Sequence, residues 1–463
     1  MFLNLDQKPP QSVAAVDDSR ISVTYGDIVS FAEEFRCVLP KRTLIFIMAT
    51  NTIGSMLGYT SCLSDGIVPL VLSAHTEKDL YGHLRNLYRP EYLWIPSDME
   101  REFGYERVFS SHGYSLVRTG LTPPDLYSDL ALLLPTSGST GSPKLVRHSY
   151  RNIEANAENV SRMFGITPEF RAMAILPMHY TMGLSVIASH LYSGATVLLC
   201  GKSMLDKGFW SMLRDGRATI LTGVPYSFEI LSKMRFFRMD LPDLRIITQG
   251  GGRMSDELFR ACADYAARTG RQFIATYGQT EGTARMAYLP AELAQTKTGS
   301  IGIAEPGGKL SIVDDSGAET FEGEATGEMV YRGENVTLGY ATCPEDLMKG
   351  DENRGVLHTG DIARRDADGC YYIIGRMKRF LKIFGLRIGL DEVEHIVKSA
   401  FDTDCLCSGT DDMLTVRITN PAIKDSVLDL IVEKTKLFHK NIEVLYVDRI
   451  ERNEAGKAIL NKQ

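Results

Sequence analysis

The segment PTSGSTGSPK, residues 135–144, combines glycine, hydroxyl and lysine side chains in a pattern that could bind phosphate. Gly138 and Gly141 allow backbone N–H groups to point at an anion, five hydroxyl side chains add donors, and Lys144 adds a positive charge. The same residue types favour exposed turns, so by themselves they fit a solvent-exposed linker equally well. The segment is not a Walker A loop, because Lys144 follows Ser-Pro and precedes Leu145.

Apolar runs and helical patterns alternate around this segment. ALLLP (131–135) precedes it and SYRNIEANAENVSRMF follows it, which predicts a strand-to-helix turn. Amphipathic stretches such as YGDIVSFAEEFRCVL and SDELFRACADYAAR separate the other strand-like runs, and this alternation predicts an α/β fold with mostly parallel sheets. Those runs are LIFIMA (44–49), IVPLVL (67–72), AMAILP (172–177), ATVLL (195–199), ATIL (218–221), LRIIT (244–248) and FIATYG (273–278).

The pattern of the chain changes twice after about residue 295. KLSIVDDSGAET, GEMVYRGENVTLGY and GCYYIIGR are short runs separated by Gly, Asp and Asn, which indicates hairpins in a small β-rich, barrel-like subdomain over about 296–377. From Lys378 onwards, a strand near LRIG, two helical patterns and the runs MLTVRIT and IEVLYVD indicate a small α+β domain. We therefore expect an N-terminal domain over 1–377 and a C-terminal domain over 378–463.

Length and composition indicate an ordinary globular protein. The 463 residues are 44% hydrophobic and 24% charged, and the net charge of −7 is spread without a basic block, which argues against nucleic acid as a partner. Eight cysteines without metal-ligand spacing indicate reduced thiols. The N-terminus MFLNLDQKPP lacks the apolar core of a signal peptide, and no run of about 18 apolar residues predicts a transmembrane segment. We expect a cytoplasmic protein.

Further motifs occur in order along nearly the whole chain. They are TYGDIVSFAEEF (24–35), SDGIVPL (64–70), QGGGRMS (249–255), TYGQTEG (276–282), GEMVYRGENVTLGY (327–340), HTGD (358–361), GRMKRFLKIFGLRIG (375–389) and RNEAGK (452–457). Together with TSGSTGSPK, this series resembles the adenylate-forming superfamily, which includes acyl-CoA synthetases, luciferases and the adenylation domains of peptide synthetases. The pattern is most similar to acyl-CoA synthetases. The resemblance implies that ATP activates a carboxylic acid as an acyl-adenylate, with release of pyrophosphate.

The resemblance implies that the glycine-rich segment holds the β- and γ-phosphates, with Thr140 and Lys144 as its main side-chain contacts. Positive charge and backbone donors must gather there to offset the triphosphate and the transition state. Glu281 is implied as a ligand of Mg²⁺ together with Thr140, and Thr280 stands beside it. A Thr-Glu pair alone would be read as a helix cap. The nucleotide-binding residues implied in the segment are Thr136, Ser137, Gly138, Ser139, Thr140, Gly141 and Lys144.

Four motifs are implied to bind the nucleoside, namely QGGGRMS, TYGQTEG, HTGD and GRMKRFLKIFGLRIG. Their glycines would let the backbone lie against the adenine, and Tyr277 would stack on its face. Asp361 would accept hydrogen bonds from the ribose hydroxyls, and Arg376 would lie near the same sugar and phosphate. Outside the family pattern these residues fit turns and packing. The residues implied at the base are Gly250, Gly251, Gly252, Tyr277, Gly278 and Gln279.

The lysine of RNEAGK, Lys457, is implied to bridge the incoming carboxylate and the α-phosphate, a task suited to a compact ammonium on a flexible stem. A lysine near a chain end is otherwise usually solvated. Lys378 matches the hinge about which the C-terminal domain turns as a lid between two half-reactions. The domain over 378–463 is shorter than is usual in the family and Glu451 stands where proline is common, but neither departure removes a catalytic group.

LPMHYTMGLSVIASH (176–190) resembles the motif that lines the acyl pocket, with His179 and Tyr180 in the reverse of the usual order. His179 is implied to gate or orient the acyl carboxylate, although a packed histidine fits the same position. No aspartate lies in this stretch, which argues against an α-amino acid as substrate. KIFGLRIG resembles the strand that lines the pantetheine path, so we expect a thiol acceptor, either coenzyme A or the phosphopantetheine of an acyl carrier protein. Another acceptor, amino-acid activation and a non-catalytic homologue that binds adenylate or acyl ligand are the alternatives, and the retained Glu281 and Lys457 favour an enzyme.

Overall fold

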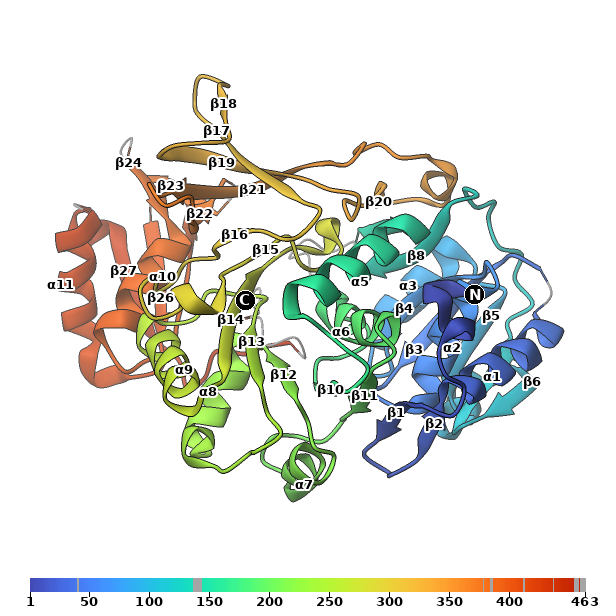
Figure 1. Cartoon of the computed structure of the whole chain (residues 1–463). Coiled ribbons are helices and arrows are strands. Elements are labelled where there is room, and N and C mark those ends of the chain that lie inside the picture. The colour runs from blue at the N-terminus through green and yellow to red at the C-terminus, as the bar shows by residue number, and fades with distance from the viewer. Residues whose placement is uncertain are drawn as a thin grey trace.

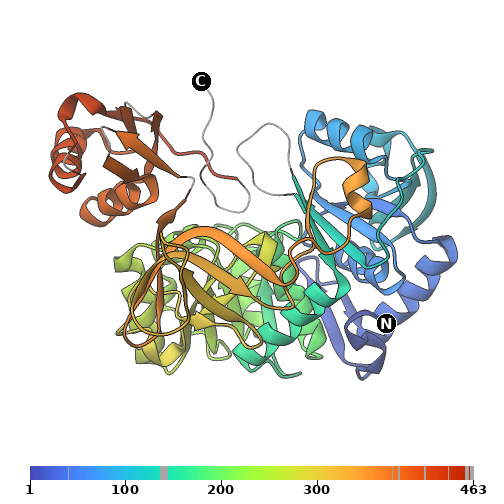
Figure 2. The ribbon, with the colours of Figure 1, turned by 90° about the horizontal axis from the view of Figure 1, so that it is seen from above.

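The computed structural model describes residues 1–39, 41–135, 144–377, 379–383, 386–410, 413–435, 437–453 and 458. Two large sheets with helices packed against them make up most of the molecule, and a five-stranded sheet lies beside the β14–β16 end of one of them (Figure 1). The unit after about residue 380 stands at the end farthest from the N-terminal sheet (Figure 2).

The N-terminal sheet consists of β3 (Leu44–Ala49), β4 (Val68–Ser73), β5 (Tyr92–Pro96), β6 (Glu106–Ser111), β7 (Tyr114–Arg118), β8 (Leu130–Pro135), β9 (Leu145–Ser149) and β20 (Gly339–Ala341). Their order is β20-β9-β8-β4-β3-β5-β7-β6. The central pairs β8–β4, β4–β3 and β3–β5 are parallel, and the outer pairs are antiparallel. All of β3 is buried, as expected for a strand covered on both faces.

The second sheet consists of β1 (Val13–Asp17), β2 (Ser22–Thr24), β10 (Arg171–Ala174), β11 (Thr196–Leu199), β12 (Ile220–Gly223), β13 (Ile246–Gln249), β14 (Gln272–Tyr277), β15 (Ala287–Tyr288) and β16 (Ile303–Ala304). Their order is β16-β15-β14-β13-β12-β10-β11-β1-β2. The run from β14 to β1 is parallel, so the carboxyl ends of β13 and β14 lie at one edge.

Side-chain caps define where several helices begin. Thr24, Ser149 and Ser255 each accept a hydrogen bond from a backbone N–H of the first turn of α1, α5 and α9. Among the described residues, no helix is long and apolar enough to cross a bilayer. The helices of the two large sheets are α1 (Tyr25–Val38), α2 (Ile53–Ser64), α3 (Lys78–Tyr88), α4 (Glu100–Phe103), α5 (Tyr150–Phe164), α6 (Thr181–Tyr192), α7 (Lys207–Asp215), α8 (Pro225–Lys233) and α9 (Asp256–Thr269).

The remaining strands form a β-rich part and a C-terminal α+β part. The antiparallel order β18-β17-β19-β21-β22 makes one sheet, and a bridge between Gly302 and Tyr371 ties it to the second large sheet. These strands are β17 (Lys309–Val313), β18 (Glu319–Thr320), β19 (Ala325–Arg332), β21 (Val356–Arg365) and β22 (Tyr371–Arg376). The C-terminal elements are β23 (Phe380–Ile383), β24 (Leu386–Gly389), α10 (Leu390–Ala400), β25 (Cys405–Thr410), β26 (Met413–Ile418), α11 (Lys424–Thr435) and β27 (Ile442–Tyr446).

Buried apolar side chains of the C-terminal part form a hydrophobic cluster of their own, from Leu381 to Val444. The predicted α/β fold, followed by β-rich and small α+β parts, is confirmed. Parallel pairing prevails in the second large sheet, whereas four of the seven described strand pairs in the N-terminal sheet are antiparallel. The exact boundary between 1–377 and 378–463 stays a prediction.

One local prediction was wrong. The glycine-rich segment does not connect a strand directly to a helix, because β9 lies between it and α5 and pairs antiparallel with β8. The strand was missed because its sequence LVRHS contains Arg147 and His148, and both side chains are buried. Burial lowers the pKa of His148 to about 4, so the strand carries a neutral histidine at neutral pH.

Glu305 is a buried carboxyl group that ties α5 to the β-rich part. It is 2% exposed, and its Oε1 accepts hydrogen bonds from Asn335 Nδ2 at 2.8 Å, Tyr331 Oη at 3.0 Å and Asn159 Nδ2 at 3.2 Å. Burial raises the pKa of Glu305 to about 8, although the hydrogen bonds from Asn159 and Tyr331 and the nearby Arg285 oppose the shift. Between pH 4.5 and about 8, Glu305 is therefore protonated in the folded protein and ionised in the unfolded chain.

We expect Glu305→Gln to remove a pH dependence of stability. The folded pKa is raised from its ordinary 4.5 to about 8. The free energy of unfolding that protonated Glu305 contributes is therefore fully present below pH 4.5. It falls as pH rises towards about 8, by at most about 1.4 kcal/mol per pH unit. In urea unfolding from pH 5 to 8, the free energy of unfolding of the variant relative to that of the wild type should increase as pH rises. The exposed Glu324→Gln is the control, and a constant difference across this range would contradict the assignment.

Candidate active site

The turn after β14 brings together several residues that the sequence implied for nucleotide and metal. It runs from Tyr277 into the short 3-10 helix η4 (Thr280–Gly282). A Cβ at Gly278 would lie 1.5 Å from the carbonyl oxygen of Ala284, so no side chain fits there. The close approach of Ala284 folds the chain back and places the side chains of the turn at the edge of the sheet.

Asp361 is the centre of a polar cluster built from this turn and from β21 and β22. Its Oδ2 accepts hydrogen bonds from Tyr277 Oη at 2.5 Å and Gln279 Nε2 at 3.0 Å. Its Oδ1 lies 3.1 Å from Arg376 Nε, because the two residues are cross-strand partners in the register of β21 and β22. Asp361 is only 2% exposed. Burial and the Asp361 charge raise the pKa of the Tyr277 phenol well above its usual value, so the phenol remains a donor.

A second cluster surrounds Glu281 at the other end of the turn. Tyr340 Oη donates a hydrogen bond to Glu281 Oε1 at 2.7 Å. Lys144 Nζ lies 5.4 Å from the centre of the Tyr340 ring, within range of a cation–π interaction. Thr181 Oγ1 donates to Thr280 Oγ1 at 3.0 Å. The structure thus brings Lys144 to the same place as Thr280 and Glu281.

The glycine triplet after β13 faces an apolar cluster. Gly251 has a φ of +78°, and a Cβ there would lie 2.7 Å from Tyr180 Oη. A Cβ at Gly250 would lie 2.9 Å from Met182 Sδ. His179 is half-buried in the turn that leads to α6. The side chains of this apolar cluster are Leu176, Met182, Val224 and Ala284, with Ile175 and Tyr180 packed against them.

The C-terminal part contacts the second large sheet next to this cluster. Arg253, which follows the glycine triplet, donates from Nη2 to His395 Nε2 of α10 at 2.9 Å. The guanidinium of Arg452 lies 5.2 Å from the centre of the Tyr226 ring of α8, and its Nη2 donates to Asp404 Oδ2 at 2.6 Å. Arg452 therefore lies beside the start of α8, which follows the carboxyl end of β12.

The described residues include Lys144, His179 and the predicted members of the glycine triplet, the 277–281 turn and the Asp361 cluster. Tyr340 was not singled out, although it ends the quoted motif GEMVYRGENVTLGY. Neither spacing nor residue type signals that it bonds Glu281. The predicted site residues Thr136, Ser137, Gly138, Ser139, Thr140, Gly141, Lys378 and Lys457 lie outside the described residues.

The residues around Glu281 fit a metal ion that binds together with a phosphate-containing molecule. Glu281 and Thr280 offer hard oxygen donors, which Mg²⁺ prefers. Within the described ranges, no group of three or more His, Cys, Asp or Glu could hold a metal ion by itself. One carboxylate with neighbouring hydroxyls suits Mg²⁺, which usually keeps waters and phosphate oxygens as its other ligands.

Comparison with known proteins settles the family. The model of the AMP-binding enzyme family matches residues 4–341. The chain belongs to the AMP-binding enzyme family. The resemblance to adenylate-forming enzymes drawn from the ordered motifs is thereby confirmed.

Curated relatives of this AMP-binding enzyme cover part of its length. The sulfoacetate–CoA ligase of Cupriavidus necator is 33% identical over 274 residues, which is 59% of this chain and 52% of the relative. The 4-coumarate–CoA ligase 3 of Oryza sativa subsp. japonica is 28% identical over 358 residues, 72% of this chain and 64% of the relative. The matches thus span about half to two thirds of these relatives.

Solved structures match over nearly the whole chain. The o-succinylbenzoate CoA synthetase (MenE) of Bacillus subtilis, in complex with its acyl-adenylate OSB-AMP, has a TM-score of 0.80 at 21% identity and covers 99% of this chain and 96% of its own. ATP-bound MatB of Rhodopseudomonas palustris has a TM-score of 0.80 at 21% identity, with the same coverage. These likenesses confirm the fold.

Proposed function

We propose that this protein activates a carboxylic acid with ATP and transfers the acyl group to a thiol. The carboxylate oxygen would attack the α-phosphorus, the bond from that phosphorus to the bridging oxygen would break, and pyrophosphate would leave. The thiol sulfur would then bond to the acyl carbon, AMP would leave, and the thiol proton would pass to solvent. The observation that carries the proposal is the turn at 277–281, which joins the Asp361 cluster to the Glu281 carboxylate.

Family membership and the names of the relatives support this chemistry. Relatives named sulfoacetate, feruloyl, 4-coumarate and indoleacetate CoA ligases or synthases favour coenzyme A as the thiol. Two others are named luciferin 4-monooxygenase, so the acceptor is the less constrained half of the proposal. The phosphopantetheine of an acyl carrier protein is the alternative thiol.

For the nucleotide, the proposal assigns Lys144 and the segment before it to the β- and γ-phosphates. The glycine triplet and Tyr277 would hold the adenine, and Asp361 with Arg376 would hold the ribose. The geometry supports the last assignment because the carboxylate and the guanidinium are already paired.

For the reaction itself, Glu281 and Thr140 would hold Mg²⁺, with Thr280 beside them in the catalytic site. When bound, Mg²⁺ would supply positive charge that offsets the charge of the departing pyrophosphate. Lys457 would act on the incoming carboxylate and the α-phosphate. His179 would orient the acid at the apolar cluster.

The proposal also covers the C-terminal part and the setting. The unit over 378–463 would act as a lid that turns about Lys378 between the half-reactions.

The substrate would be a small acid without an α-amino group, because residues 176–190 contain no aspartate to pair with such a group. A cytoplasmic location is supported by the eight cysteines, which are all free thiols in the structure.

The proposal is tested by pyrophosphate release from ATP and Mg²⁺ across fatty, aryl, hydroxy, amino and sulfonated acids, with and without coenzyme A. We expect release with one acid class, and thioester formation when coenzyme A is present. Acyl-adenylate and pyrophosphate without thioester from coenzyme A or a carrier protein would contradict the thiol transfer. ATP binding without release for any acid, even with a carrier protein, would favour a non-catalytic binding protein.

A further inference from the structure

Tyr340 links the two charged groups that the proposed function assigns to phosphate and metal. Its hydroxyl donates to Glu281 Oε1 at 2.7 Å, and Lys144 Nζ lies 5.4 Å from its ring centre. The residue is 40% exposed, so its hydroxyl is not required to fill a core. The hydrogen bond engages Oε1 of the Glu281 carboxylate and so restricts the orientation of the group.

The backbone around Glu281 is anchored to the same stretch of chain that carries Tyr340. Thr337 N donates to the carbonyl oxygen of Glu281 at 3.0 Å. Asn335 Nδ2 donates to the carbonyl oxygen of Gly282 at 2.8 Å. Both the backbone and the side chain of Glu281 are therefore held from residues 335–340, so the position of this stretch sets the position of the carboxylate.

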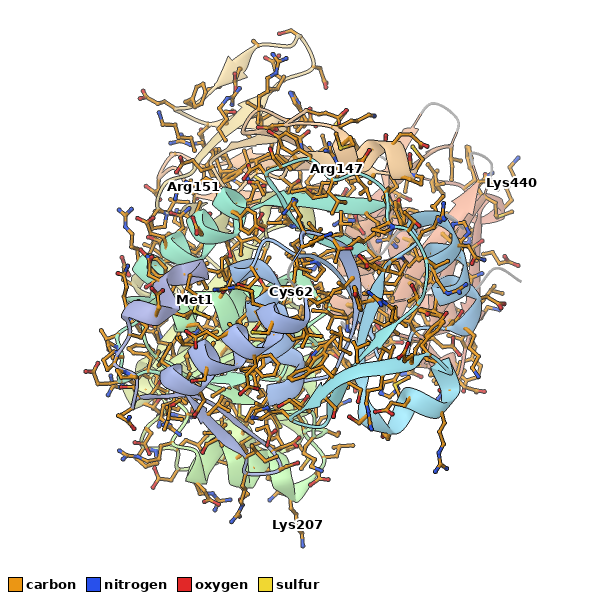
Figure 3. All side chains as sticks on the ribbon, turned by 90° about the vertical axis from the view of Figure 1, so that its right-hand side faces the viewer. Met1, Cys62, Arg147, Arg151, Lys207 and Lys440 are labelled. Carbon is orange, nitrogen blue, oxygen red and sulfur yellow. The ribbon has the colours of Figure 1, made fainter. Side chains whose placement is uncertain are left out.

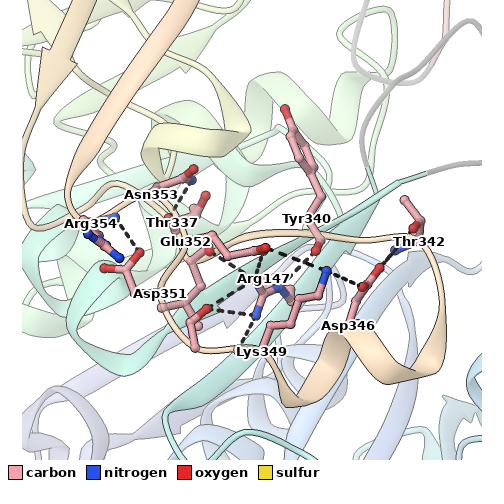
Figure 4. Close-up of polar contacts among 12 residues, drawn as sticks. Arg147, Thr337, Tyr340, Thr342, Asp346, Lys349, Asp351, Glu352, Asn353 and Arg354 are labelled. Atoms are coloured by element: carbon pink, nitrogen blue, oxygen red, sulfur yellow. Dashed lines mark hydrogen bonds and ion pairs between the residues drawn. The ribbon is translucent and has the colours of Figure 1, made fainter.

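Arg147 in turn fixes this stretch through hydrogen bonds to its backbone carbonyls. Its side chain is 0% exposed, in contrast to Lys207, which extends from the surface in Figure 3. Arg147 Nε donates to the carbonyl oxygen of Tyr340 at 3.0 Å, and Nη2 donates to that of Leu338 at 3.1 Å and to Glu352 Oε2 at 2.6 Å (Figure 4). A buried guanidinium has few arrangements that satisfy its donors, so it fixes the carbonyls that surround it.

We propose that Tyr340 is a positioning residue for the Glu281 carboxylate, and that Arg147 acts through Tyr340 by fixing its backbone. The inference rests on the proposed function, because it concerns the carboxylate assigned to Mg²⁺. Partners that hydrogen-bond a metal ligand orient it and typically change metal affinity about 10- to 100-fold. Lys144, which directly precedes β9, and the Glu281 turn would thus be aligned through Arg147 and Tyr340.

Tyr340→Phe tests the hydrogen bond while it keeps the ring beneath Lys144. We expect the gain in ATP affinity that Mg²⁺ provides, measured by titration calorimetry with and without Mg²⁺, to fall about tenfold. ATP affinity without Mg²⁺ and the KM for the acid should stay unchanged. The control is Tyr446→Phe, because Tyr446 is 49% exposed and its hydroxyl also bonds a carboxylate, Asp448, at 2.8 Å.

Equal losses of ATP affinity with and without Mg²⁺, or no loss at all, would overturn the role of Tyr340. A merely structural role would lower the melting temperature without this selective dependence on Mg²⁺. The calorimetry needs no acid substrate, so its outcome is separate from the pyrophosphate assay. A wild type that binds MgATP but releases no pyrophosphate would refute the proposed function and leave the role of Tyr340 to the calorimetry.

Arg147→Lys tests the second step, because lysine keeps the charge but lacks the fork that reaches several acceptors. We expect the same selective loss of the Mg²⁺ effect as in Tyr340→Phe, and no further loss when the two substitutions are combined. Losses that multiply in the double variant would show that Arg147 acts independently and would overturn this step. The melting temperature of each variant shows whether it is folded, and Tyr340→Phe tests the first step by itself.

Discussion

Lys457→Ala should lower the rate of acyl-adenylate formation about 10²- to 10³-fold, with little change in ATP affinity. The reason is that the proposed role of Lys457 is to offset charge that develops as the carboxylate attacks the α-phosphorus. An interaction made mainly in the transition state contributes to the rate and little to ground-state binding. Loss of such a donor therefore appears in kcat and not in the Kd for ATP.

The structure supports this expectation through the residues on either side of Lys457. Arg452 lies over the Tyr226 ring, beside the apolar cluster that contains Val224. Ala458, the residue after Lys457, forms an antiparallel bridge with Arg452. Arg452, with Ala458 paired to it, thus lies at α8, next in the chain to Val224 of the apolar cluster to which the proposed function assigns the acid.

Single-turnover formation of adenylate and calorimetric ATP binding measure the two quantities separately. Lys440→Ala is a suitable control, because Lys440 also belongs to the C-terminal part and extends from the surface in Figure 3. Turnover that is unchanged in Lys457→Ala would show that this lysine is solvated and inert. An equal loss of ATP affinity and rate would instead place it in ground-state binding.

Those parts of the fold that depend on local pattern could be predicted from the sequence. LIFIMA coincides with β3, because a strand buried on both faces must be apolar throughout. SDELFRACADYAAR coincides with α9, where a serine cap precedes an amphipathic helix that ends at a left-handed glycine, Gly270. In both cases neighbouring residues alone carry the information.

The parts that failed depend on partners far away in the chain. LVRHS did not indicate a buried strand, because burial of an arginine is normally unfavourable. Here the cost of burying Arg147 is offset by the carbonyl of Tyr340 and by Glu352, which lie about 200 residues further along the chain. The same holds for the Tyr340–Glu281 pair, whose members are 59 residues apart in the chain. Family resemblance could supply single residues of the site, whereas the contacts between them required the fold.

Asp361→Ala should weaken ATP binding about 10- to 100-fold, which corresponds to the roughly 1.5–3 kcal/mol typical of hydrogen bonds to a charged group. Two effects act together. The ribose hydroxyls lose their acceptor, and Tyr277, Gln279 and Arg376 lose the carboxylate that orders them. Unlike Lys457→Ala, this change acts on the ground state, so KM for ATP should rise more than kcat falls.

The geometry also indicates which oxygen receives the ribose. A carboxylate has about four acceptor sites. Among the described residues, Oδ2 of Asp361 accepts from Tyr277 and Gln279, whereas Oδ1 forms an ion pair with Arg376. A ribose hydroxyl should therefore approach Oδ1, beside the Arg376 guanidinium. Tyr277→Phe leaves Oδ1 and its partner intact, so it should weaken ATP binding less than Asp361→Ala does.

Comparison of ATP with 2′,3′-dideoxy-ATP by calorimetry separates recognition of the ribose from general damage to the site. The wild type should bind the dideoxy nucleotide more weakly, because two hydroxyl donors are missing. Asp361→Ala should bind both nucleotides with similar, weak affinity, since the acceptor that distinguishes them is gone. The exposed hairpin variant Asp314→Ala controls for loss of an acidic residue elsewhere. Undiminished discrimination in Asp361→Ala would remove this carboxylate from the ribose site, because a group that contacts neither hydroxyl cannot change the ratio of the two affinities.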